Sequence, residues 1–191
     1  LHFACQGAYT VDWGDGTTVQ NFSDNANAEH DFDWATISPS TLTSEGYRQC
    51  IVTITPQSGS QITNFKRTNS PHYHSEEGIV RVQNHTVCSV KMACPNMISS
   101  YLAFYYWVAL EEFEFVGTSS INNTSNFFGG CYKLKKVISF DTSTVTNFGS
   151  MFSSCYSLVE VPALNTSNGT TFTSMFNACN SIDYIPPMGV S

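Results

Sequence analysis

The chain has 191 residues, of which 41% are hydrophobic and only 12% are charged, and its formal net charge is −7 at pH 7. This length allows one or two domains with their own cores, whereas the acidic balance disfavours a nucleic-acid partner, whose phosphates need basic residues. No window of about 20 consecutive apolar residues exists, so we expect no membrane-spanning helix.

Residues 1–67 are predicted to form β-strands joined by tight turns. Apolar residues alternate with polar ones over Tyr9–Trp13 and again over Cys50–Ile54, which is the period of a strand with one buried face. The sequences Gly14-Asp15-Gly16 and Ser58-Gly59-Ser60 are typical of turns. Short strands at this spacing predict a small antiparallel β-sandwich.

Three segments of this region resemble successive elements of PKD-type domains, which are immunoglobulin-like sandwiches of surface proteins. The first is Val11–Thr17, with the sequence Val-Asp-Trp-Gly-Asp-Gly-Thr, and the others are His30–Phe32 and Gly46–Val52. A long insert over Ala35–Glu45 departs from the family pattern. The resemblance implies an all-β, immunoglobulin-like domain over residues 1–67.

Asp12 and Asp15 could be taken for a pair of catalytic carboxylates, but we favour a structural role for both. In a sandwich turn, an Asp-Gly sequence reaches positive φ and hydrogen-bonds the backbone. A Ca²⁺ ion bound near this turn is the alternative, because carboxylate oxygens suit that ion. Its ligands would come from Asp24, Glu29, Asp31 and Asp33.

Residues 68–96 are predicted as a polar junction that ends in two strands, Ile79–Val82 and Val87–Met92. His72 and His74, followed by two glutamates, have the chemistry of metal ligands. No motif fixes a third ligand, and histidines in a polar linker are usually solvated. We therefore assign no metal site to the chain. The residues that come nearest to one are Asp12, Asp15, His72 and His74.

Residues 97–191 contain a 24-residue sequence repeat that occurs more than twice, as shown by Phe128–Cys131, Phe152–Cys155 and Phe176–Cys179. A fixed period of this length predicts a solenoid of stacked units. The spacing of Met151, Phe152 and Cys155 suits a helical turn with a buried stripe, and a helix is also expected near Met97–Tyr106. The predicted core positions are Phe128, Cys131, Leu134, Val137, Phe152, Cys155, Leu158, Val161, Phe176, Cys179, Ile182 and Ile185.

The repeated unit resembles the BspA-type leucine-rich repeats of bacterial, protist and phage surface proteins. The residues that carry the resemblance run from Met151 to Ser167, with the pattern Met-Phe-x-x-Cys-x-x-Leu-x-x-Val-Pro-x-Leu-Asn-Thr-Ser. The predicted fold class is therefore mixed. An immunoglobulin-like (PKD-type) β-sandwich at 1–67 is followed by a leucine-rich-repeat-like α/β solenoid at 97–191, with the junction and first solenoid strands at 68–96.

The seven cysteines are an odd number, so they cannot all pair within the chain. Cys131, Cys155 and Cys179 fall on one repeated position and could hold a metal, but no CxxC or Cys/His cluster lies near them. We assign them to the core as small apolar residues, reduced and free of metal. A disulfide among the other cysteines stays open.

No nucleophile elbow, phosphate loop, dinucleotide fingerprint or zinc helix is present, so we expect no enzyme and no cofactor, Ca²⁺ excepted. Low charge and the resemblances suggest an extracellular, cell-surface or virion module for adhesion or assembly. Its partner would be a protein or glycan at a surface, or a neighbouring subunit. The alternatives are an architectural subunit of a filament or phage tail fibre, and an accessory domain of a secreted hydrolase. Because the chain ends within a unit, we expect it to be part of a longer polypeptide or an oligomer.

Overall fold

The computed structural model describes residues 1–33, 35, 37, 50–66, 89–97 and 103–189. In this part of the chain the strands are β1 (His2–Gln6), β2 (Tyr9–Asp12), β3 (Gln20–Phe22), β4 (Asn27–Glu29), β5 (Thr53–Pro56), β6 (Asn64–Lys66), β7 (Ser89–Met92), β8 (Glu112–Phe115) and β9 (Lys136–Ser139). His72, His74, the predicted strand Ile79–Val82 and most of the insert Ala35–Glu45 lie outside the described residues.

The N-terminal strands form two antiparallel sheets of three strands each, in the orders β4-β1-β6 and β3-β2-β5. Their shared core is aromatic. The ring of Phe3 stacks on Phe65 at 5.5 Å and lies 5.9 Å from Trp13. All three side chains are buried, so this half is compatible with the all-β prediction for residues 1–67.

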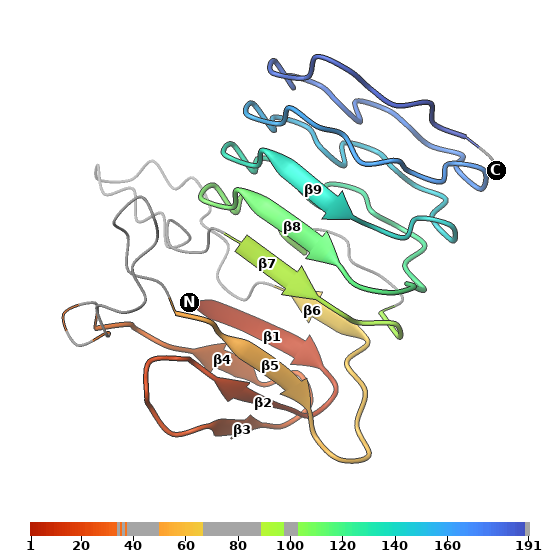
Figure 1. Cartoon of the computed structure of the whole chain (residues 1–191). Coiled ribbons are helices and arrows are strands. Elements are labelled where there is room, and N and C mark those ends of the chain that lie inside the picture. The colour runs from red at the N-terminus through yellow and green to blue at the C-terminus, as the bar shows by residue number, and fades with distance from the viewer. Residues whose placement is uncertain (34, 36, 38–49, 67–88, 98–102, 190–191) are drawn as a thin grey trace, which may run out of the picture.

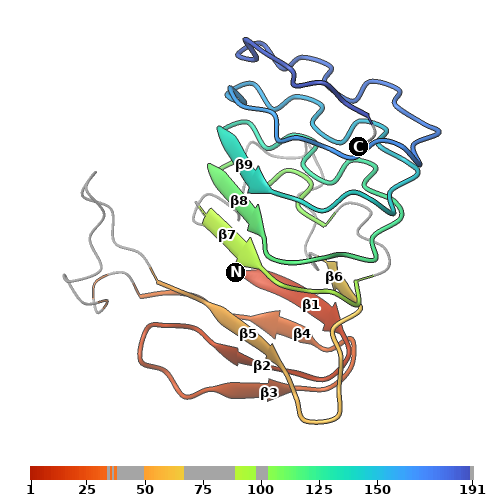
Figure 2. The ribbon, with the colours of Figure 1, turned by 45° about the vertical axis from the view of Figure 1, so that its right-hand side comes forward.

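The C-terminal half is a stack of coils, which runs upward from β7 to the C-terminus in Figure 1. Strands β7, β8 and β9 pair in parallel, and the ladder continues through single bridges between Lys136 and Glu160 and between Glu160 and Tyr184. Each of these bridges joins residues 24 apart. We call residues 103–189 the coil stack, and Figure 2 shows its coils lying one above another.

The prediction of a leucine-rich-repeat-like α/β solenoid is wrong, because the described residues contain no helix and the structure is all-β, with three small sheets. Of the helix expected near Met97–Tyr106, residues 98–102 lie outside the described residues, and residues 103–106 are turns. No helix that could span a bilayer occurs among the described residues. The helical interpretation failed because Ser150 and Ser154 have φ of 53° and 61°, whereas a right-handed helix needs negative φ throughout.

This left-handed conformation recurs every 24 residues and turns backbone N–H groups toward the next coil. The Phe152 N–H donates to Met175 O of the next coil at 2.9 Å, where a helix would use Phe148 O. Ser150 and Ser154 donate in the same way to residues 23 positions ahead. The positions of positive φ are Asn126, Ser150 and Ser174 in one row, and Tyr106, Gly130, Ser154 and Ala178 in another.

The side chains at equivalent positions stack in columns inside the coils. The ring of Phe152 lies 5.4 Å from Phe128 and 5.5 Å from Phe176, with planes within 15° of parallel. The first two coils of the predicted core are buried: Phe128, Cys131, Leu134, Val137, Phe152, Cys155, Leu158 and Val161. In the last coil Phe176, Cys179 and Ile182 are half-buried and Ile185 is exposed.

The N-terminal sandwich covers the first coil of the stack. Phe65 on β6 stacks on Phe104 at 5.5 Å, and the Cys94 thiol donates a hydrogen bond to Ile62 O at 3.1 Å. The buried residues of both halves form one continuous core. One end of the stack is therefore closed by the rest of the chain.

The Phe column predicts an order of stabilities. Phe152→Ala should cost about 3–5 kcal/mol of unfolding free energy, because it removes a buried ring packed on both sides. Phe176→Ala is the matched control and should cost less, since coil residues cover that ring on one side only. Denaturant unfolding measures both, and an equal cost would contradict the stacking order.

Candidate functional site

The two aspartates that might have formed a catalytic pair both accept hydrogen bonds from residues of the turn that contains them. Asp12 Oδ1 accepts the Gly14 N–H at 2.9 Å. Asp15 Oδ1 accepts both the N–H and the hydroxyl of Thr17, at 3.1 and 2.7 Å. These are the local bonds expected of aspartate in a turn.

The structure also joins Asp15 to His30, a pairing that the spacing of the residues did not reveal. Asp15 Oδ2 lies 2.6 Å from His30 Nε2, and the His30 ring stacks on Trp13 at 4.6 Å. Burial raises the pKa of Asp15, but the hydrogen bonds from Thr17 and His30 outweigh this effect and lower the pKa to about 2. The pair therefore ties the β2–β3 turn to the segment after β4.

No metal centre is assembled in the described part of the chain. Asp24 accepts the Gly7 N–H at 2.7 Å and Asp33 accepts the Ala35 N–H at 3.0 Å, so both support the backbone. No group of three or more His, Cys, Asp or Glu side chains among the described residues could hold an ion. The Ca²⁺ site considered for Asp24, Glu29, Asp31 and Asp33 gains no support from this arrangement.

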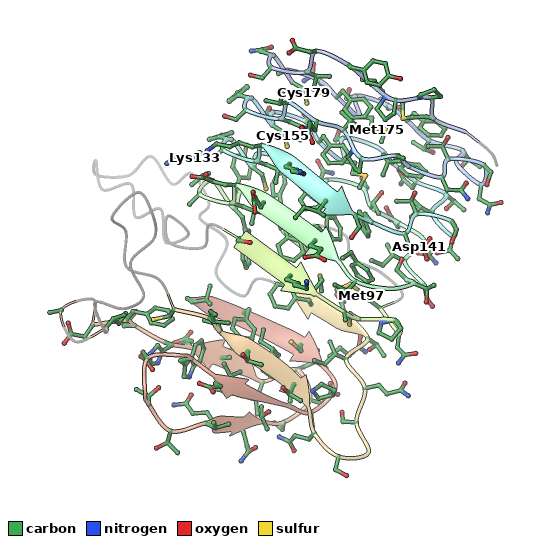
Figure 3. The ribbon with its side chains drawn as sticks, in the orientation of Figure 1. Met97, Lys133, Asp141, Cys155, Met175 and Cys179 are labelled. Atoms are coloured by element: carbon green, nitrogen blue, oxygen red, sulfur yellow. The ribbon has the colours of Figure 1, made fainter. Side chains whose placement is uncertain are left out.

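Each of the repeated cysteines donates a hydrogen bond to the coil that precedes its own in the chain. The thiols of Cys131, Cys155 and Cys179 donate to the carbonyls of Phe104, Phe128 and Phe152, at 3.1, 3.2 and 2.9 Å. Figure 3 shows Cys155 and Cys179 one above the other. Burial raises the pKa of all three thiols, with the neighbouring thiols adding to the effect at Cys155. The thiols thus serve as small apolar donors in the core.

The strongest candidate site in the described part of the chain is the side of the last coil that faces away from the stack, which we call the terminal edge. It carries side chains whose equivalents one coil earlier are buried. Phe172 is 42% exposed against 0% for Phe148, Ile185 40% against 7% for Val161, and Met188 39% against 3% for Leu164. Tyr184 is also exposed. In residues 165–189, Asp183 is the only charged side chain, so this surface is apolar and nearly neutral.

The terminal edge also carries a row of backbone donors. In the preceding coil, the N–H groups of residues 148, 150, 152 and 154 each donate to the last coil. The equivalent N–H groups belong to Phe172, Ser174, Phe176 and Ala178, and no acceptor among the described residues contacts them. The unfinished repeat predicts exposed apolar residues and a row of unpaired strand groups at this edge, but it does not predict that residues 172–178 present N–H groups, because that depends on the left-handed backbone.

A second exposed feature is a column of tyrosines on the side of the stack. The Tyr132 ring lies 5.9 Å from Tyr106 and stacks on Tyr156 at 5.1 Å. A side-chain carbon added at Gly130 would lie 2.8 Å from the Tyr106 ring. Glycine at this position therefore allows the ring to lie directly against the next coil.

Comparisons with known proteins give one similarity, which covers less than half of the chain. Residues 97–184 match the family described as "Mycoplasma protein of unknown function, DUF285". The match spans most of the coil stack and leaves the N-terminal sandwich uncovered. No curated protein and no solved structure matches the chain. The resemblances to PKD-type domains and BspA-type repeats are not addressed by these comparisons and stay predictions.

The Asp15–His30 pair predicts a pH dependence. Because the folded pKa of Asp15 is about 2 and its ordinary value is 3.8, the carboxylate stabilises the fold above about pH 4. This contribution should disappear as the pH falls from about 4 to about 2. Unfolding by urea should therefore show Asp15→Asn to be less stable than the parent chain at pH 7, and the difference should shrink below pH 4. A difference that persists at pH 2 would contradict this role.

The donor row predicts uneven amide exchange. The amides of Phe172, Ser174, Phe176 and Ala178 should exchange with solvent much faster than those of residues 148, 150, 152 and 154, which have acceptors. Exchange measured by NMR on the dilute chain tests this. Equal protection of the two rows would show that the edge is covered.

Proposed function

We propose that this chain is a non-enzymatic module of a cell surface or virion whose coil stack is continued at the terminal edge by further repeats of the same polypeptide or by a neighbouring protein subunit. The observation that carries the proposal is the terminal edge. It combines exposed Phe172, Ile185 and Met188 with a row of backbone N–H groups that have no acceptor within the described part of the chain.

Two properties of this edge favour a protein partner over a small or charged ligand. Exposed apolar side chains next to unpaired backbone donors are the usual liability of an open sheet edge, which another chain relieves by pairing with it. The residues around the edge also supply one charged group, Asp183. A highly charged ligand would find no opposite charge there, whereas a protein surface can bury the apolar groups.

The tyrosine column favours a second candidate function, which is adhesion through the side of the stack. Tyr156 is 44% exposed at the end of this column, and tyrosine rings offer a large amphipathic contact surface to proteins and glycans. In that case substitutions at the side of the stack, and not at its end, would weaken binding.

The assembly proposal predicts that the chain associates at micromolar concentration and that Ile185→Lys lowers this association by about tenfold or more, because a buried lysine must lose its hydration. Ile138→Lys is the matched control, since Ile138 is at least as exposed as Ile185, 50% against 40%, but lies on the face of β9. Light scattering over a concentration series measures both variants. A chain that stays monomeric, or equal effects of the two substitutions, would contradict the proposal.

A further inference from the structure

A pair of stacked tyrosines lies on the side of the coil stack. The Tyr132 ring lies on the Tyr156 ring at a centroid distance of 5.1 Å, with an angle of 22° between the two planes. The two residues are 24 positions apart and so hold the same position in successive coils. The equivalent residues in the preceding and following coils are Val108 and Asn180. This position therefore provides one tyrosine pair, between two coils that each have a neighbour on both sides.

The backbone holds the two rings in register. The Ser157 N–H donates to Tyr132 O at 3.2 Å, and the Ser181 hydroxyl donates to Tyr156 O at 2.6 Å. Because successive coils are related by nearly a simple shift, equivalent carbons of the two rings lie about as far apart as the ring centroids. Tyr132 is half-buried and Tyr156 is 44% exposed, so the pair is open to solvent along one side.

The other described tyrosines of the stack are not arranged in this way. Tyr106 meets Tyr132 edge-on, at 5.9 Å and with an interplanar angle of 86°. Tyr105 meets Tyr106 at 77°. Tyr184 is the most exposed of them at 67%, but no tyrosine ring among the described residues contacts it. Parallel stacking of two solvent-open phenols is thus confined to Tyr132 and Tyr156.

We propose that Tyr132 and Tyr156 are the site of an oxidative carbon–carbon cross-link that joins two adjacent coils. The oxidant is hydrogen peroxide acting through a haem peroxidase. Each phenol loses its hydroxyl hydrogen atom and becomes a phenoxyl radical, whose unpaired electron is shared with the ring carbons next to the C–O carbon. One such carbon from each ring forms the new bond, and the hydrogen that each carbon carried moves to the phenol oxygen of its own ring. The two hydrogen atoms lost from the phenols reduce one peroxide to two waters.

Proximity favours this coupling and gives it a structural consequence. Two groups that a rigid scaffold holds side by side react at a high effective concentration, and here the Ser157–Tyr132 backbone bond supplies the scaffold. The new bond would close a loop across the 24-residue period, which reduces the entropy that the chain gains when the coils separate. The cross-link adds a covalent tie to the backbone bonds between these coils. It does not depend on what lies beyond the terminal edge.

The test treats the dilute full chain with a haem peroxidase and limiting hydrogen peroxide, and then analyses a tryptic digest by mass spectrometry. Lys133, Lys135 and Lys136 lie between the two tyrosines, so trypsin separates the tyrosines unless they are joined. We expect residues 92–133 and 137–191 to appear as one linked species, lighter than the sum of the two peptides by two hydrogen atoms. Fragmentation should place the bond on Tyr132.

Two substitutions to phenylalanine distinguish stacking from exposure. Tyr156→Phe should lower the yield of the linked species by about tenfold or more, because no other pair has the proximity of the stacked rings. Tyr184→Phe is the control, since it removes a more exposed tyrosine from the same peptide, and it should leave the yield unchanged. A linked species that survives Tyr156→Phe, or links found only between separate chains, would overturn the proposal. Oxidation of Tyr184 without any bond between Tyr132 and Tyr156 would overturn it as well.

Discussion

The structure depends on one hydrogen bond, made again and again: an N–H in one coil donates to a carbonyl 23 residues further along the chain. Phe152 to Met175 is an example, at 2.9 Å. The bond forms because left-handed residues such as Ser150 and Ser154 turn alternate N–H groups out of the coil. The alternate N–H groups still bond locally, as from Met151 to Phe148 O at 3.1 Å, but the others need an acceptor in a neighbouring coil, so a coil does not satisfy its own backbone.

This requirement explains the composition of the chain. Ser, Thr and Asn side chains reinforce the bonds between coils: Thr146 donates to Asn122 O at 3.1 Å and Thr170 donates to Thr146 O at 3.1 Å. Asn165 and Asp141 bend the chain by accepting the N–H two residues ahead. Uncharged hydroxyl and amide groups therefore make many of the polar contacts between and within the coils. Salt bridges from Lys135 to Glu111 at 2.7 Å and from Lys136 to Glu160 at 3.7 Å also link adjacent coils.

The sequence alone was informative wherever a side chain marks its own position. The 24-residue spacing of Phe128, Phe152 and Phe176 located a column that the structure contains, and alternation over Tyr9–Trp13 located β2. Backbone conformation was not readable in this way. The spacing of Met151, Phe152 and Cys155 fits a helix as well as a coil, and only the sign of φ at Ser150 and Ser154 separates them. The terminal edge was partly predictable for the same reason: the unfinished repeat indicates exposed apolar residues and unpaired strand groups, but not which backbone groups residues 172–178 present.

The central claim, that the coils are joined by backbone bonds across the period, can be tested by scalar couplings transmitted through hydrogen bonds in NMR spectra of the labelled chain. The amide nitrogen of Phe152 should couple to the carbonyl carbon of Met175, and that of Ser150 to the carbonyl carbon of Thr173. Coupling of the Phe152 nitrogen to the carbonyl carbon of Phe148 would instead show a helical turn, and would contradict this account of the fold and of its open end.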